Sequence, residues 1–175
     1  IADSMLNVDD CRASERTFSQ LTQVCGRAGR AGKPGRAIVQ TYSPGDPVLI
    51  CASNQDYKEF FDGEIKLRQA FLNPPFTKIV CVLFSGDDEK DVQRCAKSIN
   101  DYFYSLVKYD TKLCTEYFGV NSAPINKING KYRYRILMKT ASAKILDVLS
   151  LVSKHHISSG SPIYMDISIN PNSIL

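Results

Sequence analysis

Two arginines and a glutamine at fixed spacing are the residues of this sequence best suited to phosphate chemistry. Gln23, Gly26, Arg27 and Arg30 follow the pattern Q-x-x-G-R-x-x-R. In a helix Arg27 and Arg30 would share a face, because residues three apart are neighbours on the helix surface. Paired guanidinium groups can donate hydrogen bonds to a transferring phosphoryl group, and a glutamine can orient a water or a phosphate oxygen. The alternative is a solvated helix face.

The same stretch lacks the spacing of a phosphate-binding loop. A Walker A loop needs Gly, four residues, then Gly-Lys-Ser/Thr. Counting back from Gly32-Lys33 places Arg27 at the first Gly position, and Pro34 follows Lys33. The sequence therefore favours a group that reaches toward a nucleotide held elsewhere.

A second group of charged residues lies on and beside a predicted strand, 131–139. Its basic members are Lys127, Lys131, Arg133, Arg135 and Lys139. Those on the strand alternate with apolar and tyrosine residues, so they should project to one face of a sheet while Tyr132 and Tyr134 face the core. Such a face can bind nucleic-acid phosphates without sequence preference. The alternative is a solvated sheet face.

Composition sets limits on the class of protein. The net charge is +4, and its excess lies in 74–175, which holds 13 basic and 9 acidic residues. No apolar run approaches 18 residues, so no membrane partner is expected. The sequence begins at Ile1 without a start Met or a signal peptide. These features favour a fragment of a cytoplasmic protein.

Cysteines and histidines are not expected to bind metal. The six cysteines show no C-x-x-C spacing, which argues against a zinc site and a disulfide framework and predicts mostly buried thiols. His155 and His156 are adjacent, so their side chains should point different ways. We expect them at a surface helix end.

Periodicity predicts a mixed α/β chain. The predicted helices span 12–28, 56–72 and 88–107, with one more opened by Pro47 and another capped by Ser142. The predicted strands span 37–42, 78–84, 113–118, 131–139 and 163–169, with a polar loop over 119–130. From residue 74 onward the order is β-α-β-β-α-β, which is the ferredoxin-like arrangement.

Blocks of residues along nearly the whole chain resemble the PriA family of bacterial primosomal helicases. The blocks are Asp3-Ser-Met-Leu, Asp10 to Phe18, Gln23 to Arg30, Gln40 to Pro44, Asp56-Tyr57, Pro74-Pro-Phe76, Ala123-Pro-Ile, Lys131-Tyr-Arg133 and Asp166 to Pro171. The sequence departs from the family pattern at Asp9, Cys11, Val120 and Asn170. These are packing and turn positions.

The resemblance implies three parts and a function. Residues 1–54 would be the C-terminal part of a second, RecA-like motor lobe, 55–73 a bridging helix, and 74–175 a ferredoxin-like domain. The parent protein would be an ATP-dependent DNA helicase that recognises stalled or branched replication forks and initiates primosome assembly for replication restart. Its partners would be forked DNA, single-stranded DNA-binding protein and other primosome proteins.

The resemblance also implies roles for single residues. Arg30 would be the arginine finger, Arg27 would hold the phosphates beside Gly26, and Gln23 would position water or phosphate. Asp3 would lie in a motif that links nucleotide state to DNA grip. The parent would use ATP and Mg²⁺, and would carry zinc on residues outside this sequence. The fragment alone should not hydrolyse ATP.

A different class of function is a stand-alone binding module. In that case residues 74–175 would bind RNA or protein without motor function. The Gly- and Arg-rich stretch over 26–35 would then be a flexible basic loop. A free basic loop would be cleaved first by a protease, so proteolysis of residues 1–50 discriminates between the two hypotheses. A protein-docking role for the bridging helix and C-terminal domain is a third possibility.

Overall fold

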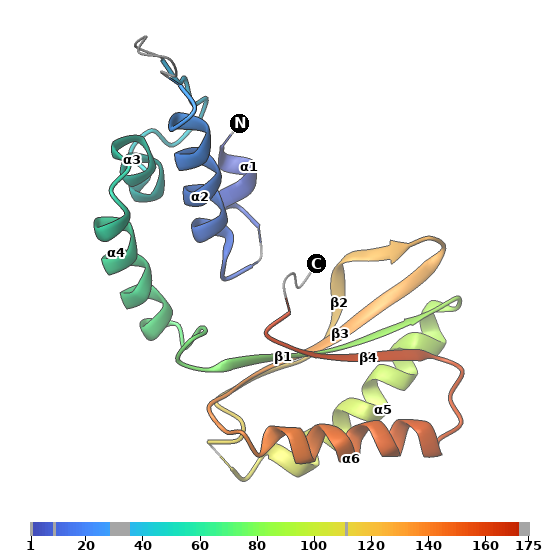
Figure 1. The fold of residues 1–175 in the computed structure, drawn as a ribbon. Helices are drawn as coiled ribbons and strands as arrows, with labels where there is room; N and C mark the ends of the chain where they lie inside the picture. Colours follow the sequence, from blue (N-terminus) through green and yellow to red (C-terminus); the bar gives the residue numbers. More distant parts are fainter. Residues whose placement is uncertain (1, 9, 29–35, 111, 172–175) are drawn as a thin grey trace. The chain divides into compact units, whose positions relative to one another are not determined.

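The computed structural model describes residues 2–8, 10–28, 36–110 and 112–171, and these form two compact units, Ile1–Phe71 and Leu72–Leu175 (Figure 1). Helix α4, the predicted bridging helix, belongs to the first unit. The three-part division made from the sequence stays a prediction.

Helices make up the regular structure of the first unit within its described residues. They are α1 (Asp3–Leu6), α2 (Ala13–Cys25), α3 (Pro47–Asn54) and α4 (Tyr57–Ala70). A small core of Phe18, Cys51, Ala52 and Phe60 joins three of them, and the Phe18 and Phe60 rings stack with centroids 4.2 Å apart. Burial of this apolar stripe holds α2, α3 and α4 together.

Helix starts in this unit follow the capping chemistry of the sequence. Asp46 accepts a hydrogen bond from the Val48 backbone N–H at 2.8 Å, and Pro47 occupies the first helical position. Asp56 accepts from the Glu59 N–H at 2.9 Å. Both satisfy backbone donors that a helix start leaves unpaired. For α2 the sequence offers Asp9 or Asp10 as the cap: Asp9 lies outside the described residues, and Asp10 accepts from the Arg12 N–H at 2.9 Å.

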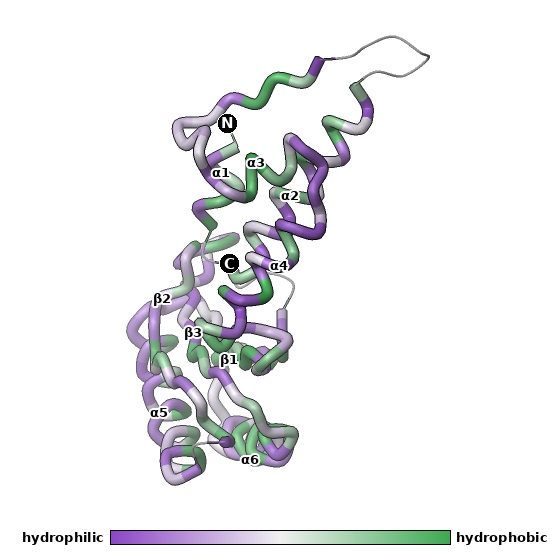
Figure 2. Tube along the Cα trace, turned by 90° about the vertical axis from the view of Figure 1, so that its left-hand side faces the viewer, coloured by the Kyte–Doolittle hydropathy of each residue, from purple (hydrophilic) through white to green (hydrophobic). Residues whose placement is uncertain are grey.

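The strand predicted over 37–42 is wrong, and a RecA-like lobe is not seen. Residues 36–42 have no strand assignment and are exposed apart from Thr41, which is half-buried, although the middle of the segment is hydrophobic (Figure 2). Ile38 is 83% exposed. A strand needs a neighbour to pair its backbone groups, and no described residue of this unit forms a ladder with the segment.

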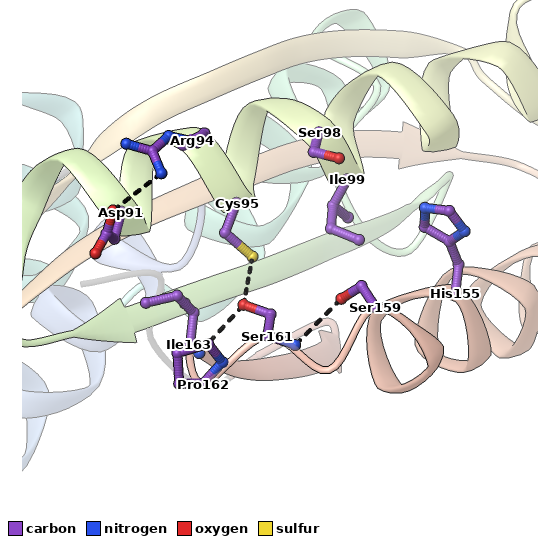
Figure 3. Close-up of a pocket in the computed structure, with 10 residues that line it drawn as sticks. All are labelled: Asp91, Arg94, Cys95, Ser98, Ile99, His155, Ser159, Ser161, Pro162 and Ile163. Carbon is purple, nitrogen blue, oxygen red and sulfur yellow. Dashed lines mark hydrogen bonds and ion pairs between the residues drawn. The ribbon is translucent and has the colours of Figure 1, made fainter.

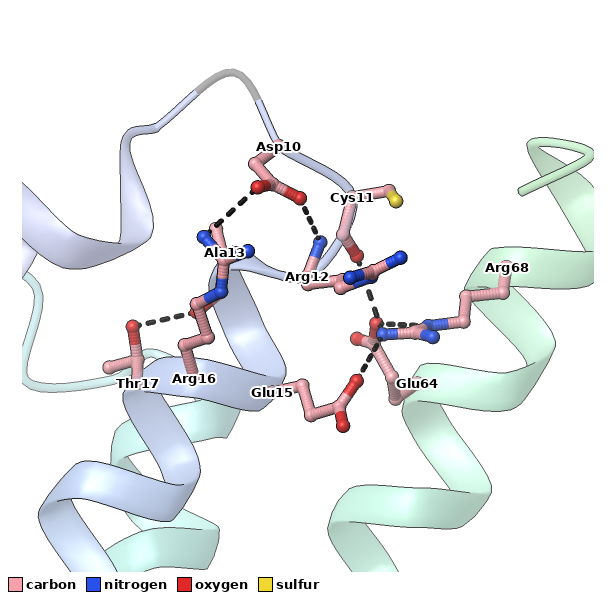
Figure 4. Close-up of polar contacts among 9 residues, drawn as sticks. All are labelled: Asp10, Cys11, Arg12, Ala13, Glu15, Arg16, Thr17, Glu64 and Arg68. Atoms are coloured by element: carbon pink, nitrogen blue, oxygen red, sulfur yellow. Dashed lines mark hydrogen bonds and ion pairs between the residues drawn. The ribbon is translucent and has the colours of Figure 1, made fainter. Parts of the chain in front are cut away.

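A half-buried arginine joins α2 to α4 in the first unit (Figure 4). The Arg68 guanidinium lies 2.8 Å from the Glu64 carboxylate on its own helix and 2.9 Å from the Glu15 carboxylate on α2. It also donates to the Cys11 carbonyl at 3.4 Å. Burial alone would lower the pKa of Arg68, but the two glutamates raise it.

The second unit is a four-stranded antiparallel sheet with two helices on the same face (Figure 1). Its elements are β1 (Lys78–Gly86), α5 (Glu89–Val107), β2 (Glu116–Ile128), β3 (Lys131–Thr140), α6 (Ile145–Ser158) and β4 (Tyr164–Ile169). The strand order β2-β3-β1-β4 is the one that a split β-α-β unit produces. The predicted element order is confirmed, and the sheet is compatible with a ferredoxin-like domain.

The core of this unit lies between the sheet and the helices. Val80, Val82 and Phe84 of β1 meet Ala96 and Phe103 of α5, and all five are fully buried. Asp88 caps α5 by accepting from the Asp91 N–H at 2.9 Å. The alternating pattern of β1 and the three-and-four spacing of α5 therefore both point to one core.

The polar loop predicted over 119–130 is wrong. Most of it belongs to β2, which pairs with β3 in a long hairpin ending at Asn129-Gly130. The register shifts between Tyr117 and Gly119 and again between Ser122 and Lys127. Gly119 has φ +67°, a backbone conformation that favours glycine. This irregular part of β2 therefore contains residue types that are also typical of loops.

Candidate functional site

The motif that was predicted to face a phosphate lies at the C-terminal end of α2. Gln23 is in the last turn of the helix, Gly26 closes it, and Arg27 follows in a turn; all three are exposed. Gly26 has ordinary helical angles (φ −67°, ψ −14°), so its backbone does not require glycine here. Arg30, the predicted finger, lies outside the described residues.

Asp3 holds α1 to the segment 36–42. Its carboxylate accepts from the Thr41 hydroxyl at 3.0 Å and from the Tyr42 N–H at 3.1 Å. Partial desolvation would raise the pKa of Asp3, but these hydrogen bonds lower it below its usual value. Asp3 therefore contacts this segment, and no hydrogen bond joins it to Gln23 or Arg27 among the interactions of the described residues.

A mostly apolar cleft of about 190 Å³ lies beside the end of α2. It is lined by Leu21 and Cys25 of α2, by Val39, and by Leu49 and Ile50 of α3, among others. Gln23 and Arg27 do not line it. This cleft suits apolar side chains and lacks the charged donors that a phosphate needs.

The basic residues of β3 do not form the continuous solvated stripe that alternation predicted. Arg135 is only 6% exposed. The Lys139 ammonium lies 2.9 Å from the Glu116 carboxylate and 5.7 Å from the centre of the Phe118 ring. The sequence predicts which side chains share a face of the sheet. Packing against neighbouring strands determines how exposed each of these side chains is.

The basic residues at the hairpin end are more accessible. Lys127 and Lys131 are exposed and Arg133 is half-exposed, with an Arg133 Nη1 to Ile125 carbonyl distance of 3.4 Å. The Lys127 ammonium lies 4.2 Å from the centre of the Tyr132 ring. The tyrosines of β3 pack against the core, as predicted.

Three accessible apolar side chains on β2 lie beside the basic residues and were not predicted as site residues: Phe118 lies by Lys139, Ile125 by Arg133, and Ile128 pairs with Lys131. Phe118, Ile125 and Ile128 are 46%, 50% and 39% exposed. They lie in or beside the stretch that was predicted to be a loop. In a loop, an apolar residue cannot be assigned to either face of a sheet. The aromatic and β-branched residues Tyr117, Phe118 and Val120 are the signal that could have extended the strand.

The cysteines and histidines differ from expectation in part. All six cysteines are free thiols, but only Cys51 and Cys81 are buried, and burial raises the pKa of both. His155 is exposed and stacks on Tyr102 at 4.1 Å, whereas His156 is buried. A surface position is thus right for His155 and wrong for His156.

No group of three or more His, Cys, Asp or Glu side chains among the described residues could hold a metal ion. No helix in the described ranges is long and apolar enough to cross a membrane.

Comparison with known proteins identifies relatives over the whole chain. Residues 69–172 match the family model of the primosomal protein N C-terminal domain. The replication restart protein PriA of Synechocystis sp. is 34% identical over 173 residues, which are 99% of this chain and 20% of that protein. The protein of the same name from Bacillus subtilis is 31% identical over 172 residues, which are 98% of this chain and 21% of that protein.

The chain therefore spans about a fifth of the length of these relatives. The family-model match covers more than half of the chain, including all of β1 to β4. The ordered sequence blocks and this match together show that the chain belongs to the PriA family of replication restart proteins.

Proposed function

We propose that this chain is part of a cytoplasmic, ATP-dependent DNA helicase that acts at stalled or branched forks and starts primosome assembly for replication restart. Residues 1–54 would contribute to a motor lobe, 55–73 would bridge, and 74–175 would contact DNA or protein partners. The observation that carries this proposal is the match of residues 69–172 to the family model.

The end of α2 supports a nucleotide-facing role. Gln23 and Arg27 are exposed, and neither is engaged with another described side chain. Both side chains can therefore turn toward a phosphate without breaking an ion pair to any described residue. We propose that ATP, Mg²⁺ and zinc are held by other parts of the longer protein, and that Arg27 and Arg30 donate to the phosphates.

A chimera tests this role. This chain would replace the matching segment of the Bacillus subtilis relative, and DNA-dependent ATP hydrolysis would be measured. Arg27→Ala and Arg30→Ala should each lower the rate by a large factor, about 10³ for a finger. Lys66→Ala, which removes an exposed cation from α4, is the control and should have no effect. Unchanged hydrolysis in both arginine variants would overturn the proposal. The chain alone should show no ATPase.

The β2–β3 hairpin supports contact with the DNA backbone. Lys127, Lys131 and Arg133 place accessible cations along it, and cations on an accessible surface bind phosphates. Arg135 and Lys139 remain candidates, but the burial of Arg135 means that its removal would also disturb the sheet.

Fluorescence anisotropy with forked, duplex and single-stranded DNA across a salt series tests this contact. Lys131→Ala and Arg133→Ala should each weaken binding and reduce the salt slope by about one. Lys154→Ala, an exposed cation on α6, is the control. Absence of binding at low salt would remove DNA contact from this chain.

A second candidate is a stand-alone ferredoxin-like module without motor function. The compactness of the second unit, which contains its own core, favours it. In that case single-stranded DNA-binding protein or other primosome proteins would be the partners to test in place of DNA.

A further inference from the structure

A cavity of about 450 Å³ lies between α5, the end of α6 and the loop before β4 (Figure 3). Its lining includes Cys95 and Ser98 of α5, and Ser159, Ser161 and Ile163 around the loop. This volume is within the range of small-molecule sites. None of these residues belongs to the sites proposed above, and Cys95 is a half-exposed free thiol.

The buried His156 is oriented as a proton acceptor toward Cys95. Its Nε2 lies 2.9 Å from the Ile163 carbonyl oxygen. A carbonyl only accepts hydrogen bonds, so Nε2 carries the proton and Nδ1 of the neutral ring carries a lone pair. That Nδ1 is 3.8 Å from the Cys95 sulfur. The thiol therefore donates to the imidazole.

A hydroxyl group completes the surroundings of the sulfur. Ser161 Oγ accepts from the Ile163 N–H at 3.3 Å and donates its proton to the Cys95 sulfur at 3.6 Å. Ser159 Oγ donates to the His156 carbonyl at 2.6 Å and accepts from the Ser161 N–H at 3.4 Å, which fixes the loop. A thiolate at Cys95 would keep two donors, this hydroxyl and a protonated imidazole.

His156 is fixed in the last turn of α6, which ends at Ser158. A nucleophile beside a base that is itself held by a third group is the arrangement found at reactive cysteines.

We propose that Cys95 is a thiol-modification site that forms mixed disulfides with small disulfides entering this cavity. The thiol proton moves to His156 Nδ1, and the Cys95 thiolate attacks one sulfur of the incoming disulfide. A new S–S bond forms as the old one breaks, and the leaving thiolate takes the proton from His156. Cys95 is oxidised and one half of the small disulfide is reduced, so the exchange is balanced.

The other cysteines provide internal controls. Cys114 is half-exposed like Cys95, but burial raises its pKa, and no imidazole is hydrogen-bonded to it in the described part of the chain. It should react slowly. Cys51 and Cys81 are buried and should react only after unfolding.

The test is incubation of the folded chain with oxidised glutathione, followed by mass spectrometry of the modified peptides over time. Cys95 should be modified roughly tenfold faster than Cys114. His156→Gln, whose amide can keep the bond to the Ile163 carbonyl, should lower the Cys95 rate to that of Cys114. Lys154→Ala, which changes an exposed side chain on the same helix that does not line the cavity, is the control and should leave the rate unchanged.

Circular dichroism and thermal unfolding confirm that each variant is folded. If His156→Gln does not fold, Ser161→Ala replaces it and should slow Cys95 severalfold. The proposal is overturned if Cys95 in the unmodified sequence reacts no faster than Cys114. It is also overturned if a folded His156→Gln or Ser161→Ala variant reacts at the original rate.

Discussion

At the scale of single residues, Asp3 connects parts of the first unit that are far apart in sequence. Its carboxylate bonds to Thr41 and Tyr42 require the ionised form, which is why its pKa is lowered. An Asp with a depressed folded-state pKa stabilises the fold above its unfolded pKa, and this contribution is lost as pH falls through the folded value.

Asp3→Asn should therefore lower the stability of the first unit near neutral pH. The difference from the original sequence should shrink as the pH falls through the folded-state pKa of Asp3, which lies below its usual value. Urea unfolding followed by circular dichroism at a series of pH values measures this difference. A difference that stays constant with pH would show that the carboxylate charge is not responsible.

Helix position was easier to predict than side-chain burial. The helix predicted over 12–28 agrees with α2 as far as Cys25, whereas the burial of Arg135 and His156 was not predicted. The burial of His156 depends on partners outside its own helix, the Ile163 carbonyl and the Cys95 sulfur on α5. A local pattern contains no information about such partners.

At the scale of elements, Arg68 is the polar link between α2 and α4. Its side chain and that of Glu64 are each 14% exposed. Arg68→Ala should destabilise the first unit by about 2 kcal/mol, because hydrogen bonds to charged groups are lost and Glu64 is left without its partner. Arg94→Ala is the matched control.

The Arg94 control also breaks an ion pair within one helix, to Asp91 at 3.3 Å, but its side chain is 79% exposed. Exposed pairs contribute about 0–1 kcal/mol. Chemical denaturation measures both variants. Equal losses in the two would mean that burial does not set the strength of the Arg68 contacts.

The end of β1 needs a residue without a side chain. A Cβ on Gly86 would lie 2.7 Å from Ile163 Cδ1 and 2.9 Å from Val92 Cγ2, both in the core. Gly86→Ala should therefore cost about 1–3 kcal/mol through overpacking. Gly63→Ala in α4 meets nothing within 4 Å, so it should be neutral or stabilising by up to about 1 kcal/mol. Thermal unfolding compares them, and a neutral Gly86→Ala would contradict the packing argument.

Helices and strands were predicted correctly where a clear hydrophobic periodicity was bounded by capping or turn residues. Asp56 and Asp88 mark helix starts, and α5 has a long apolar stripe. The predictions failed where regular structure depends on a partner. Residues 36–42 have the composition of a strand but no neighbour among the described residues, and β2 has the composition of a loop but pairs with β3.

At the scale of the whole molecule, each unit has its own hydrophobic cluster, and the larger cluster lies entirely within Leu72–Leu175. Residues 72–175 expressed alone should therefore fold, because the core and all four strands are kept. Circular dichroism and dispersed amide signals in NMR spectra would test this. An unfolded fragment would show that the sheet depends on residues 1–71.

The two ends of the sheet-forming segment meet at one point. Asn170, just after β4, donates its N–H to the Ile79 carbonyl at 2.7 Å and accepts from the Ile79 N–H through its side chain at 2.8 Å. Strands β1 and β4 are antiparallel, so tension applied between residues 72 and 171 would peel their hydrogen bonds apart one at a time. The second unit should thus unfold at low force under mechanical tension, and the two hydrogen bonds between Asn170 and Ile79 should break first.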